Sequence, residues 1–265
     1  MVEKRRIVTE SLDPPARVVD SRREGQNVLR HPIRGAEYFL TVARHDELPP
    51  AGPPEIAFAG RSNAGKSSAI NALADRTKLA YTSKTPGRTQ QINFFQLRSG
   101  ALLTDLPGYG YAAVPQALKK HWQDFLAHYL ATRQSLIGLA LVVDARRGLG
   151  DLDRQLLALY LTSGRPVLLL ATKIDKLGTS AQREAERAIA RDLATAFPAH
   201  ASQVAVVPFS ATHRIGIDAA EATLAAWLGD GAVAEGAASV PNSVLTPGSG
   251  PDSGGKKKRP RAQGE

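Results

Sequence analysis

The stretch IAFAGRSNAGKSS, residues 56–68, decides the fold of this chain. Its first four residues are mostly apolar and predict a buried strand. The segment from Gly60 to Ser67 has the spacing GxxxxGKS, in which the glycines let the backbone curl so that successive amides face one anion. A helix that begins near Lys66 adds its positive end to the same place. The sequence therefore predicts a phosphate-binding loop between a strand and a helix.

Two side chains of this loop have a predicted role. Lys66 supplies a point charge to the outer phosphates of a nucleotide, and Ser67 offers its hydroxyl to Mg²⁺. The alternative is a glycine-rich turn that binds nothing. The context favours the phosphate loop, because Ile70 and Leu73 give the following segment one apolar helical face.

Composition limits the class of protein. The 265 residues suffice for one core. The absence of cysteine excludes disulfides, thiolate metal sites and cysteine nucleophiles. Neither an apolar leader near the start nor a run of about 18 apolar residues occurs. We expect a soluble, cytoplasmic, monomeric protein without a membrane partner.

The net charge of +9 is unevenly distributed. Residues 51–104 carry seven basic and two acidic side chains. This exceeds what one triphosphate can use, so an RNA-facing surface is one interpretation and a solvated basic face is the other. The basic residues in excess are Arg76, Lys78, Lys84, Arg88 and Arg98.

Strand and helix signals alternate along the middle of the chain, which predicts a three-layer α/β fold around the phosphate loop, with a mainly parallel six-stranded sheet and flanking helices. The expected strands are 56–59, 92–97, 101–105, 137–143, 167–172 and 203–207. Helices are expected after Lys66, around the apolar stripe Leu118, Trp122, Phe125, Leu126 and Tyr129, after a cap at Asp151, over 181–196 with Thr179 and Gln182 as a capping box, and over 218–228. Residues 38–42 are expected to form a short element.

The two ends of the chain differ from the middle in composition. Residues 1–34 are expected to be a loosely ordered arm, and 35–228 the nucleotide-binding domain. Residues 229–265 are expected to form a disordered tail that closes with a basic cluster at 256–261. That cluster either contacts RNA or only keeps the tail soluble.

Three further motifs follow the loop in the order that a nucleotide switch requires. Asp105 to Gly108 match DxxG, whose carboxylate holds Mg²⁺ through a water and whose glycine amide approaches the γ-phosphate. Thr172 to Asp175 match TKxD, in which Asp175 accepts hydrogen bonds from N1–H and the 2-amino group of guanine. Adenine offers neither donor, so GTP should be preferred over ATP by about 10⁴ or more. The segment 208–211 ends the last strand, where a backbone amide meets guanine O6.

The segment 83–91, SKTPGRTQQ, lies between the loop and DxxG. It contains Thr85 and Thr89, and one of them must reach Mg²⁺ in the triphosphate state. We choose Thr89 because it directly precedes the next strand. Pro86 and Gly87 suggest a segment that becomes ordered with the γ-phosphate.

Together these motifs resemble the EngB (YsxC) family of bacterial GTP-binding proteins, within the translation-factor-related class. The resemblance covers roughly residues 36–228. It rests on the loop at 54–68, on SKTPGRTQ at 83–90, INFF at 92–95, DLPGYGYA at 105–112, VDARRG at 143–148 and TKIDK at 172–176.

The resemblance implies a GTPase that acts in assembly of the large (50S) ribosomal subunit and in normal septation, with precursor rRNA and ribosomal proteins as partners. It implies Mg²⁺ bound by Ser67 and Thr89, and hydrolysis that depends on Lys66, Thr89 and Asn63. The implied nucleotide contacts are Gly60, Arg61, Ser62, Asn63, Ala64, Gly65, Lys66, Ser67, Gly87, Arg88, Thr89, Gln90, Gln91, Asp105, Leu106, Pro107, Gly108, Thr172, Lys173, Ile174, Asp175, Phe209, Ser210 and Ala211.

Two residues bear on the mechanism. Tyr109 stands where Ras-type GTPases have a water-orienting Gln, so slow intrinsic hydrolysis is expected. Asn63 resembles the loop residue of GTPases that hold K⁺ beside the phosphates, which makes stimulation by K⁺ a hypothesis. Two other functions compete with the assembly switch. One is an RNA-binding scaffold that nucleotide merely stabilises, and the other is a protein-directed cell-division switch.

Overall fold

The computed structural model describes residues 31–81, 91–110 and 116–234. By its contacts the chain separates into Met1–Ala234 and Glu235–Glu265, and the second unit lies wholly outside the described residues. None of the described helices is long and apolar enough to cross a membrane.

The sheet has seven strands in the order β1-β3-β4-β2-β5-β6-β7, rather than the six expected. Strands β2, β4, β5, β6 and β7 run parallel, and β3 and β1 are antiparallel additions at one edge. The bounds are β1 Glu37–Val42, β2 Glu55–Gly60, β3 Ile92–Gln96, β4 Leu102–Asp105, β5 Leu136–Asp144, β6 Val167–Thr172 and β7 Val204–Pro208.

The seventh strand is the short element expected near residues 38–42. Its pattern is hard to recognise because Tyr38 and Phe39 are 62% and 45% exposed, and because the register shifts between Tyr38 and Leu40. Because the first three residues of β1 are all exposed, the strand lacks the alternation of a strand packed on the core, which explains the difference in strand count.

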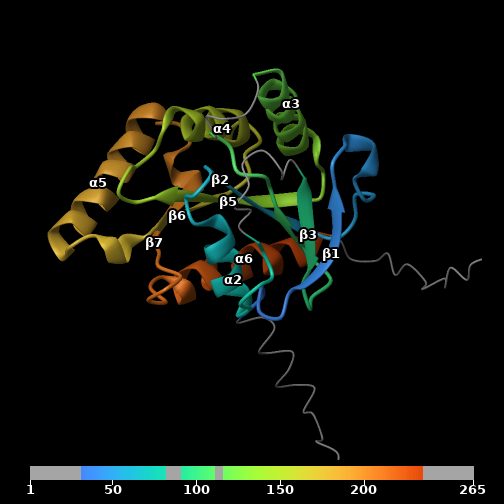
Figure 1. Cartoon of the computed structure of the whole chain (residues 1–265), viewed down its shortest axis with the longest axis horizontal. Coiled ribbons are helices and arrows are strands. Elements are labelled where there is room, and N and C mark those ends of the chain that lie inside the picture. Colours follow the sequence, from blue (N-terminus) through green and yellow to red (C-terminus); the bar gives the residue numbers. More distant parts are fainter. Residues whose placement is uncertain (1–30, 82–90, 111–115, 235–265) are drawn as a thin grey trace, which may run out of the picture. The chain divides into compact units, whose positions relative to one another are not determined.

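Helices cover both faces of the sheet (Figure 1). Apolar side chains of α3, α4 and α5 share one core cluster with the sheet, and those of α2 and α6 share the other. The bounds are α2 Lys66–Ala74, α3 Gln116–Thr132, α4 Asp151–Leu161, α5 Thr179–Ala196 and α6 Ile217–Ala234, with short 3-10 turns at η1 His45–Glu47, η2 Ile174–Lys176 and η3 Ala201–Gln203. This is the predicted three-layer α/β arrangement.

Two helix starts differ from the expectation. Asp151 and Thr179 are the first residues of α4 and α5, and the caps are Gly150 and Gly178. At α4, the carboxylate of Asp153 accepts the Gly150 amide at 2.8 Å. Asp153, the third residue of α4, thus binds the amide of the N-cap residue, whereas a side chain at the N-cap would bind an amide inside the first turn. An acidic residue near a helix start fits either position, which explains the difference from the expected cap.

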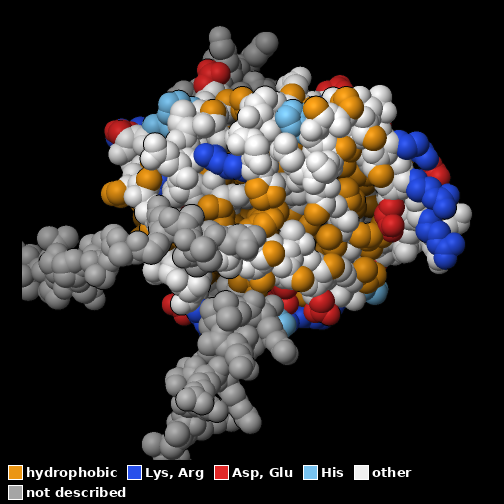
Figure 2. All heavy atoms as spheres, turned by 180° about the vertical axis from the view of Figure 1, so that it is seen from behind, with side chains coloured by type: hydrophobic (Ala, Val, Ile, Leu, Met, Phe, Trp, Pro, Cys, Tyr) orange, Lys and Arg blue, Asp and Glu red, His pale blue; other side chains and the backbone are white. Residues whose placement is uncertain are grey.

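Helix α5 is amphipathic, and its outer face is charged, with three arginines beside acidic residues such as Glu184, which pairs with Arg191 at 2.6 Å. Ile189 and Leu193 are buried against the sheet, while Arg183, Arg187 and Arg191 recur at four-residue spacing and are exposed. Seen from behind, a row of basic side chains follows the edge that α5 occupies (Figure 2).

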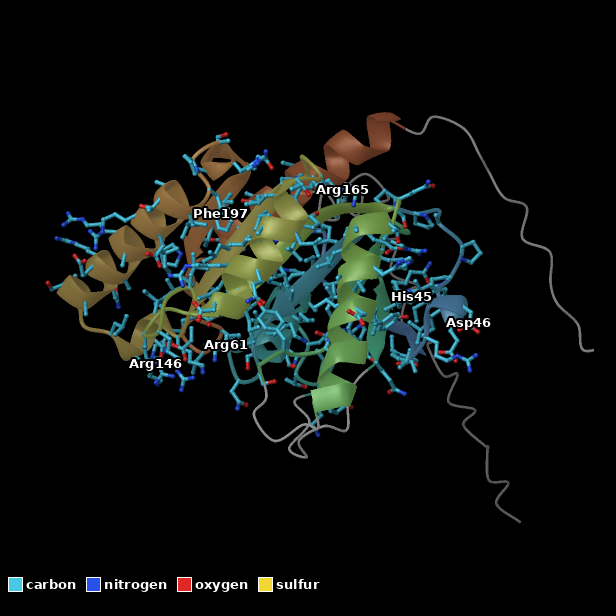
Figure 3. The ribbon with its side chains drawn as sticks, turned by 90° about the horizontal axis from the view of Figure 1, so that it is seen from above. His45, Asp46, Arg61, Arg146, Arg165 and Phe197 are labelled. Atoms are coloured by element: carbon cyan, nitrogen blue, oxygen red, sulfur yellow. The ribbon has the colours of Figure 1, made fainter. Side chains whose placement is uncertain are left out.

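The parallel strands give the domain two distinct ends. Arg61 follows β2 and Arg146 follows β5, so both lie at the carboxyl ends of strands, whereas Arg165 precedes β6 at the amino end (Figure 3). The chain leaves β2 toward β4 on one side and later adds β5 on the other. The switch point of a doubly wound sheet therefore lies at the carboxyl end of β2, where ligands of this architecture bind.

Candidate functional site

The phosphate loop connects β2 to α2 at this switch point. Asn63 and Gly65 have positive φ angles of 67° and 104°, so the backbone takes left-handed turns within the loop. Gly65 is the N-cap of α2, and no side chain caps the helix. The first amides of α2 are therefore free of a capping side chain and face outward at the positive end of the helix.

Gly60, at the start of the loop, packs directly on β5. A side-chain carbon at this position would lie 2.6 Å from the carbonyl oxygen of Val142. No larger residue fits there without moving the backbone of β5. The glycine thus has a packing reason beside the curvature of the loop.

Lys66 and Asp105 meet at the centre of the site. The Lys66 ammonium forms an ion pair with the carboxylate of Asp105, at the carboxyl end of β4. Their side chains are 10% and 7% exposed. The structure therefore brings the lysine of the loop and the aspartate of DxxG together, as the order of motifs predicts.

DxxG continues along the edge of the loop. Leu106 and Pro107 are buried, and the side chain of Leu106 belongs to the core. Gly108 is exposed and lies against Ser62, whose hydroxyl donates to the Gly108 carbonyl at 3.3 Å. Within DxxG, the Asp105 carboxylate contacts Lys66 and the Gly108 backbone contacts Ser62 of the phosphate loop. The Leu106 side chain faces the core instead.

Part of the predicted magnesium site can be located. The hydroxyl of Ser67 makes only a long contact, 3.5 Å, to the Tyr81 carbonyl, so it retains the capacity to bind a cation. Gln91 is exposed just before β3. The other predicted first-switch residues, Gly87, Arg88, Thr89 and Gln90, lie outside the described residues, as do Lys84 and Thr85. Within the described ranges, no group of three His, Cys, Asp or Glu residues is placed to hold a metal.

TKxD begins at the end of β6 and is tied to the phosphate loop. Thr172 places its hydroxyl against the Ala64 and Val143 carbonyls. Lys173 has a positive φ of 59°, and its ammonium donates to the Asn63 carbonyl at 2.6 Å. These two residues fix the loop and the base-recognition segment relative to each other.

Asp175 follows in the turn η2. Its side chain is 6% exposed, and its Oδ2 atom has no hydrogen-bond partner among the described residues. The Oδ2 atom forms an ion pair with the Lys176 ammonium at 3.1 Å and lies 3.5 Å from Nδ1 of His213. A hydrogen bond from the Ser210 side chain, together with the Lys176 ammonium, outweighs burial and lowers the pKa of Asp175. A buried, ionised carboxylate whose Oδ2 atom is shared only with the exposed Lys176 ammonium is suited to a ligand that brings N–H donors.

The segment after β7 completes this side of the site. The Phe209 side chain is fully buried, and its amide donates to the Ala171 carbonyl at 2.9 Å. The Ser210 amide donates to the Ile215 carbonyl at 3.0 Å. Of the three predicted contacts, Ala211 is therefore the one whose amide makes no hydrogen bond within the described part of the chain. Ile174, next to Asp175, is likewise a core residue.

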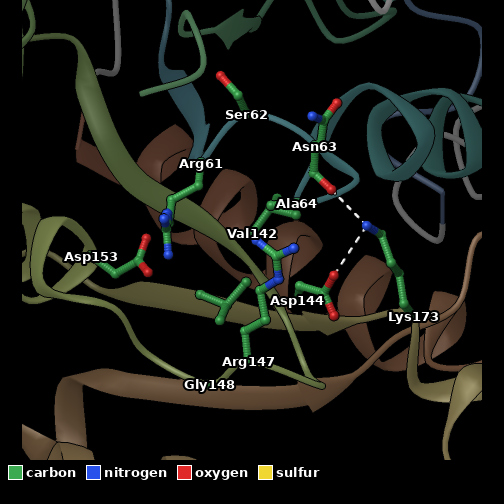
Figure 4. A pocket seen from close by; sticks show the side chains of 11 residues that line it. Arg61, Ser62, Asn63, Ala64, Val142, Asp144, Arg147, Gly148, Asp153 and Lys173 are labelled. Atoms are coloured by element: carbon green, nitrogen blue, oxygen red, sulfur yellow. Dashed lines mark hydrogen bonds and ion pairs between the residues drawn. The ribbon is translucent and has the colours of Figure 1, made fainter. Parts of the chain in front are cut away.

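A polar pocket of about 110 Å³ adjoins the loop (Figure 4). Its residues are Arg61, Ser62, Asn63, Ala64, Val142, Val143, Asp144, Arg147, Gly148, Asp153 and Lys173. The pocket touches Lys173 but neither Ser67 nor Asp175, so it lies beside the predicted nucleotide site rather than filling it.

Asp144 and Asp153 in this pocket were not predicted as site residues. Burial raises the pKa of Asp144, but hydrogen bonds from Arg146 and Lys173 outweigh burial and lower it to about 2. Burial raises the pKa of Asp153, which also accepts the Tyr109 hydroxyl at 2.6 Å. Asp144 could have been predicted from its place in VDARRG, at the end of the buried strand β5. Asp153 lies inside a helix and gave no signal.

Comparison with known proteins agrees with these observations. Residues 55–173 match a family model described as 50S ribosome-binding GTPase. The chain is 50% identical over 197 residues to "Probable GTP-binding protein EngB" of Aromatoleum aromaticum, which covers 74% of this chain and 89% of that protein. It is 47% identical over 203 residues to the protein of the same name in Bordetella pertussis, at 74% and 96% coverage.

Solved structures support the fold. A crystal structure of a probable GTP-binding protein EngB superposes with a TM-score of 0.54, covering 66% of this chain and 99% of that one at 23% identity. Era, in a crystal structure with MgGDPNP and a segment of 16S ribosomal RNA, gives a TM-score of 0.52 at 19% identity, covering 72% and 60% of the two chains. The phosphate loop, the two strand-end aspartates and the identity to these relatives lead to one conclusion: this chain belongs to the EngB family of GTP-binding proteins and is a P-loop GTPase.

Proposed function

We propose that this GTPase is a switch in assembly of the large ribosomal subunit, docking on precursor rRNA in its GTP form and leaving after hydrolysis. The description of the matching family model, 50S ribosome-binding GTPase, supports this role. We also propose that the same GTPase acts in septation. Era, which shares the fold, has been crystallised with ribosomal RNA.

The observation that carries the nucleotide assignment is the position of Asp175. Its buried Oδ2 lacks a hydrogen-bond partner among the described residues, while Lys173 joins the same segment to the phosphate loop. We assign N1–H and the 2-amino group of guanine to Asp175, and O6 to the Ala211 amide. Gly60 to Ser67 surround the phosphates, and the Lys66 ammonium exchanges part of its contact with Asp105 for the outer phosphates.

Mg²⁺ fits the oxygen groups at the site. Ser67 would bind it directly, Thr89 would join when the triphosphate is present, and Asp105 would hold it through water. Bound Mg²⁺ would neutralise charge on the phosphates during transfer. Asn63, with its side chain exposed beside the loop, would place K⁺ near the same charge.

The K⁺ assignment has a direct test. GTP turnover is measured in KCl and in NaCl for the wild type and for Asn63→Ala. We expect faster turnover in K⁺ for the wild type and no difference between the salts for the variant. Equal turnover in both salts, with wild type and variant alike, would refute the assignment.

The exposure of three basic residues from the predicted excess supports an RNA-facing surface. Arg76, Lys78 and Arg98 are all exposed. Arg98 lies over Gly35, whose amide donates to the Ala74 carbonyl at the end of α2. Arg98 and Arg76 therefore lie near each other although they are far apart in the sequence. Such a cluster favours a polyanion.

The proposal is tested by co-sedimentation with large subunits in a GTP analogue and in GDP over a salt series. The variant Arg76→Gln/Lys78→Gln/Arg98→Gln should lose binding, and a variant with Arg183, Arg187 and Arg191 changed to Gln on α5 controls for lost charge. Binding that ignores the nucleotide would favour the scaffold function. Absence of ribosomal binding at low salt would favour the cell-division switch and refute the proposal.

A further inference from the structure

The segment after DxxG is attached to the phosphate loop through its backbone. Tyr109 and Arg61 form a short parallel bridge between the two segments. The Ser62 amide donates to the Tyr109 carbonyl at 2.8 Å, and the Tyr109 amide donates to the Gly60 carbonyl at 3.3 Å. Gly108 therefore lies between β4 and Tyr109, whose backbone is hydrogen-bonded to the phosphate loop.

The side chain of Tyr109 attaches the same segment to α4. Its hydroxyl donates to Asp153 Oδ1 at 2.6 Å, and Asp153 Oδ2 accepts the Gly150 amide at 2.8 Å. Tyr109 is 6% exposed and Asp153 1%. Both carboxylate oxygens of Asp153 are occupied, so the tyrosine is bound to a rigid acceptor. Hydrogen bonds to a charged group in a buried place are the strong ones.

The backbone next to this bond is built for close packing. Gly110 has a positive φ of 77°, and a side-chain carbon there would lie 3.3 Å from both Leu152 and Arg61. A carbon at Gly150 would lie 2.9 Å from the Arg61 guanidinium. Arg61 therefore fills the space between the two segments, as its position beside Asp153 in Figure 4 illustrates.

From this arrangement we infer that Tyr109 and Asp153 are positioning residues for the γ-phosphate: their hydrogen bond holds the Gly108 amide against the phosphate loop before GTP binds. The inference rests on the proposed contact between Gly108 and the γ-phosphate. GDP has no γ-phosphate, so the bond contributes to affinity for GTP and to hydrolysis but not to affinity for GDP. A tyrosine that only filled the core would affect both nucleotides equally.

The test compares affinities for a non-hydrolysable GTP analogue and for GDP, measured by calorimetry with Mg²⁺ present. In Tyr109→Phe the ratio of the two affinities should fall by roughly tenfold, which corresponds to about 1.4 kcal/mol. Asp153→Asn keeps the shape and one acceptor oxygen, so a smaller fall in the same direction is expected. The double variant should be no worse than Tyr109→Phe, because both changes remove one interaction.

Helix α4 supplies a matched control. Tyr160 is also buried there, but its hydroxyl has no hydrogen-bond partner within the described residues. Tyr160→Phe should leave the ratio unchanged. Urea unfolding of each variant identifies any that does not fold, and Asp153→Asn then carries the test.

Two results would overturn the inference: an equal loss of affinity for both nucleotides, or an unchanged ratio in Tyr109→Phe and Asp153→Asn. Failure of the wild type to prefer guanine over adenine nucleotides would instead contradict the proposed function. The two failures are therefore distinguishable.

Discussion

Glu55 and Asp175 are both buried carboxylates near strand ends of one sheet, but they lie at opposite ends of the parallel strands. Glu55 begins β2 and is fully buried. It accepts hydrogen bonds from Tyr129 at 2.7 Å, Ser135 at 2.8 Å and Arg133 Nε at 2.9 Å. Arg133 also donates to the Pro49 carbonyl at 2.7 Å.

Asp175 follows β6 and has fewer partners. Its Oδ2 atom has no hydrogen-bond partner among the described residues beyond the ion pair with Lys176, and the neighbouring side chains of Lys176 and His213 are 58% and 57% exposed. Lys173, two residues before Asp175, has a left-handed backbone with a φ of 59°. A carboxylate whose acceptors are all used inside the core stabilises the fold, whereas one shared only with an exposed lysine is suited to a ligand.

The largest effect is expected at Asp175. Asp175→Asn replaces one acceptor with an N–H donor that faces the guanine 2-amino group. One charge-assisted hydrogen bond is lost at about 1.5–3 kcal/mol, and two donors then face each other unpaired at a further cost of about 1–3 kcal/mol, so affinity for GTP should fall by about 3–6 kcal/mol. Calorimetry measures this loss.

A second nucleotide separates this effect from damage to the fold. Xanthosine triphosphate carries a carbonyl oxygen where guanine has its 2-amino group, so it should bind Asp175→Asn better than GTP does. The free energy of unfolding should change by less than about 1 kcal/mol, because the neighbouring cations are exposed. If Asp175→Asn kept the wild-type affinity for GTP, Asp175 would not be a ligand-binding carboxylate, and it would not differ from Glu55 in function.

The opposite pattern is expected at Arg133. Arg133→Met leaves Glu55 buried without its cation, which should cost about 3–5 kcal/mol of unfolding free energy. Urea denaturation measures the loss, and GDP affinity should stay within about twofold of wild type.

Arg165→Met is the matched control at the same end of the sheet. The Nη1 atom of Arg165 is buried and has no hydrogen-bond partner within the part of the chain described, so this substitution removes no comparable interaction. If Arg133→Met proved as stable as Arg165→Met, the Glu55 network would not be structural.

The sequence predicted the residues at the carboxyl ends of the parallel strands better than those at the amino ends. The phosphate loop, DxxG and TKxD are contiguous motifs whose chemistry depends on local spacing, and in the structure Lys66 pairs with Asp105 while Lys173 donates to the Asn63 carbonyl. The Glu55 network joins β2 to α3 and to the connection between α3 and β5, and none of these segments has a local signature. Asp153 could not be predicted for the same reason, since it acts by accepting a hydrogen bond from Tyr109, which is 44 residues away in the sequence.

Strand β1 and the helix caps show a different reason for error. An edge strand with exposed aromatic residues has no clear alternation, and a helix can be capped from outside or from inside its first turn. Core contacts of Leu106, Ile174 and Phe209 also depend on tertiary packing. Their membership in a binding motif gave no indication that their side chains face away from the site.

A moderate effect is expected from pH. The pKa of Asp144 is lowered from 3.8 to about 2 in the folded protein, so its ionised form stabilises the fold by about 2 kcal/mol above the unfolded pKa. This contribution should be complete above pH about 4 and lost as the pH falls toward 2. Asp144→Asn should therefore flatten the stability curve between those values in urea titrations. An unchanged slope would show that Arg146 and Lys173 do not stabilise the charge.

The smallest effect is expected at Tyr160. Its hydroxyl is buried without a hydrogen bond among the described residues, so Tyr160→Phe should be neutral or stabilising by up to about 1 kcal/mol. Thermal unfolding measures the change. A clear loss of stability would reveal a partner for this hydroxyl and would weaken its use as the control for Tyr109.

The most direct measurement is titration calorimetry of the wild-type chain with GTP and with ATP in the presence of Mg²⁺. A carboxylate at position 175 that reads guanine, joined to the phosphate loop through Lys173, predicts tighter binding of GTP by about 10⁴ or more. Equal affinity for the two nucleotides, or binding of neither, would contradict the account.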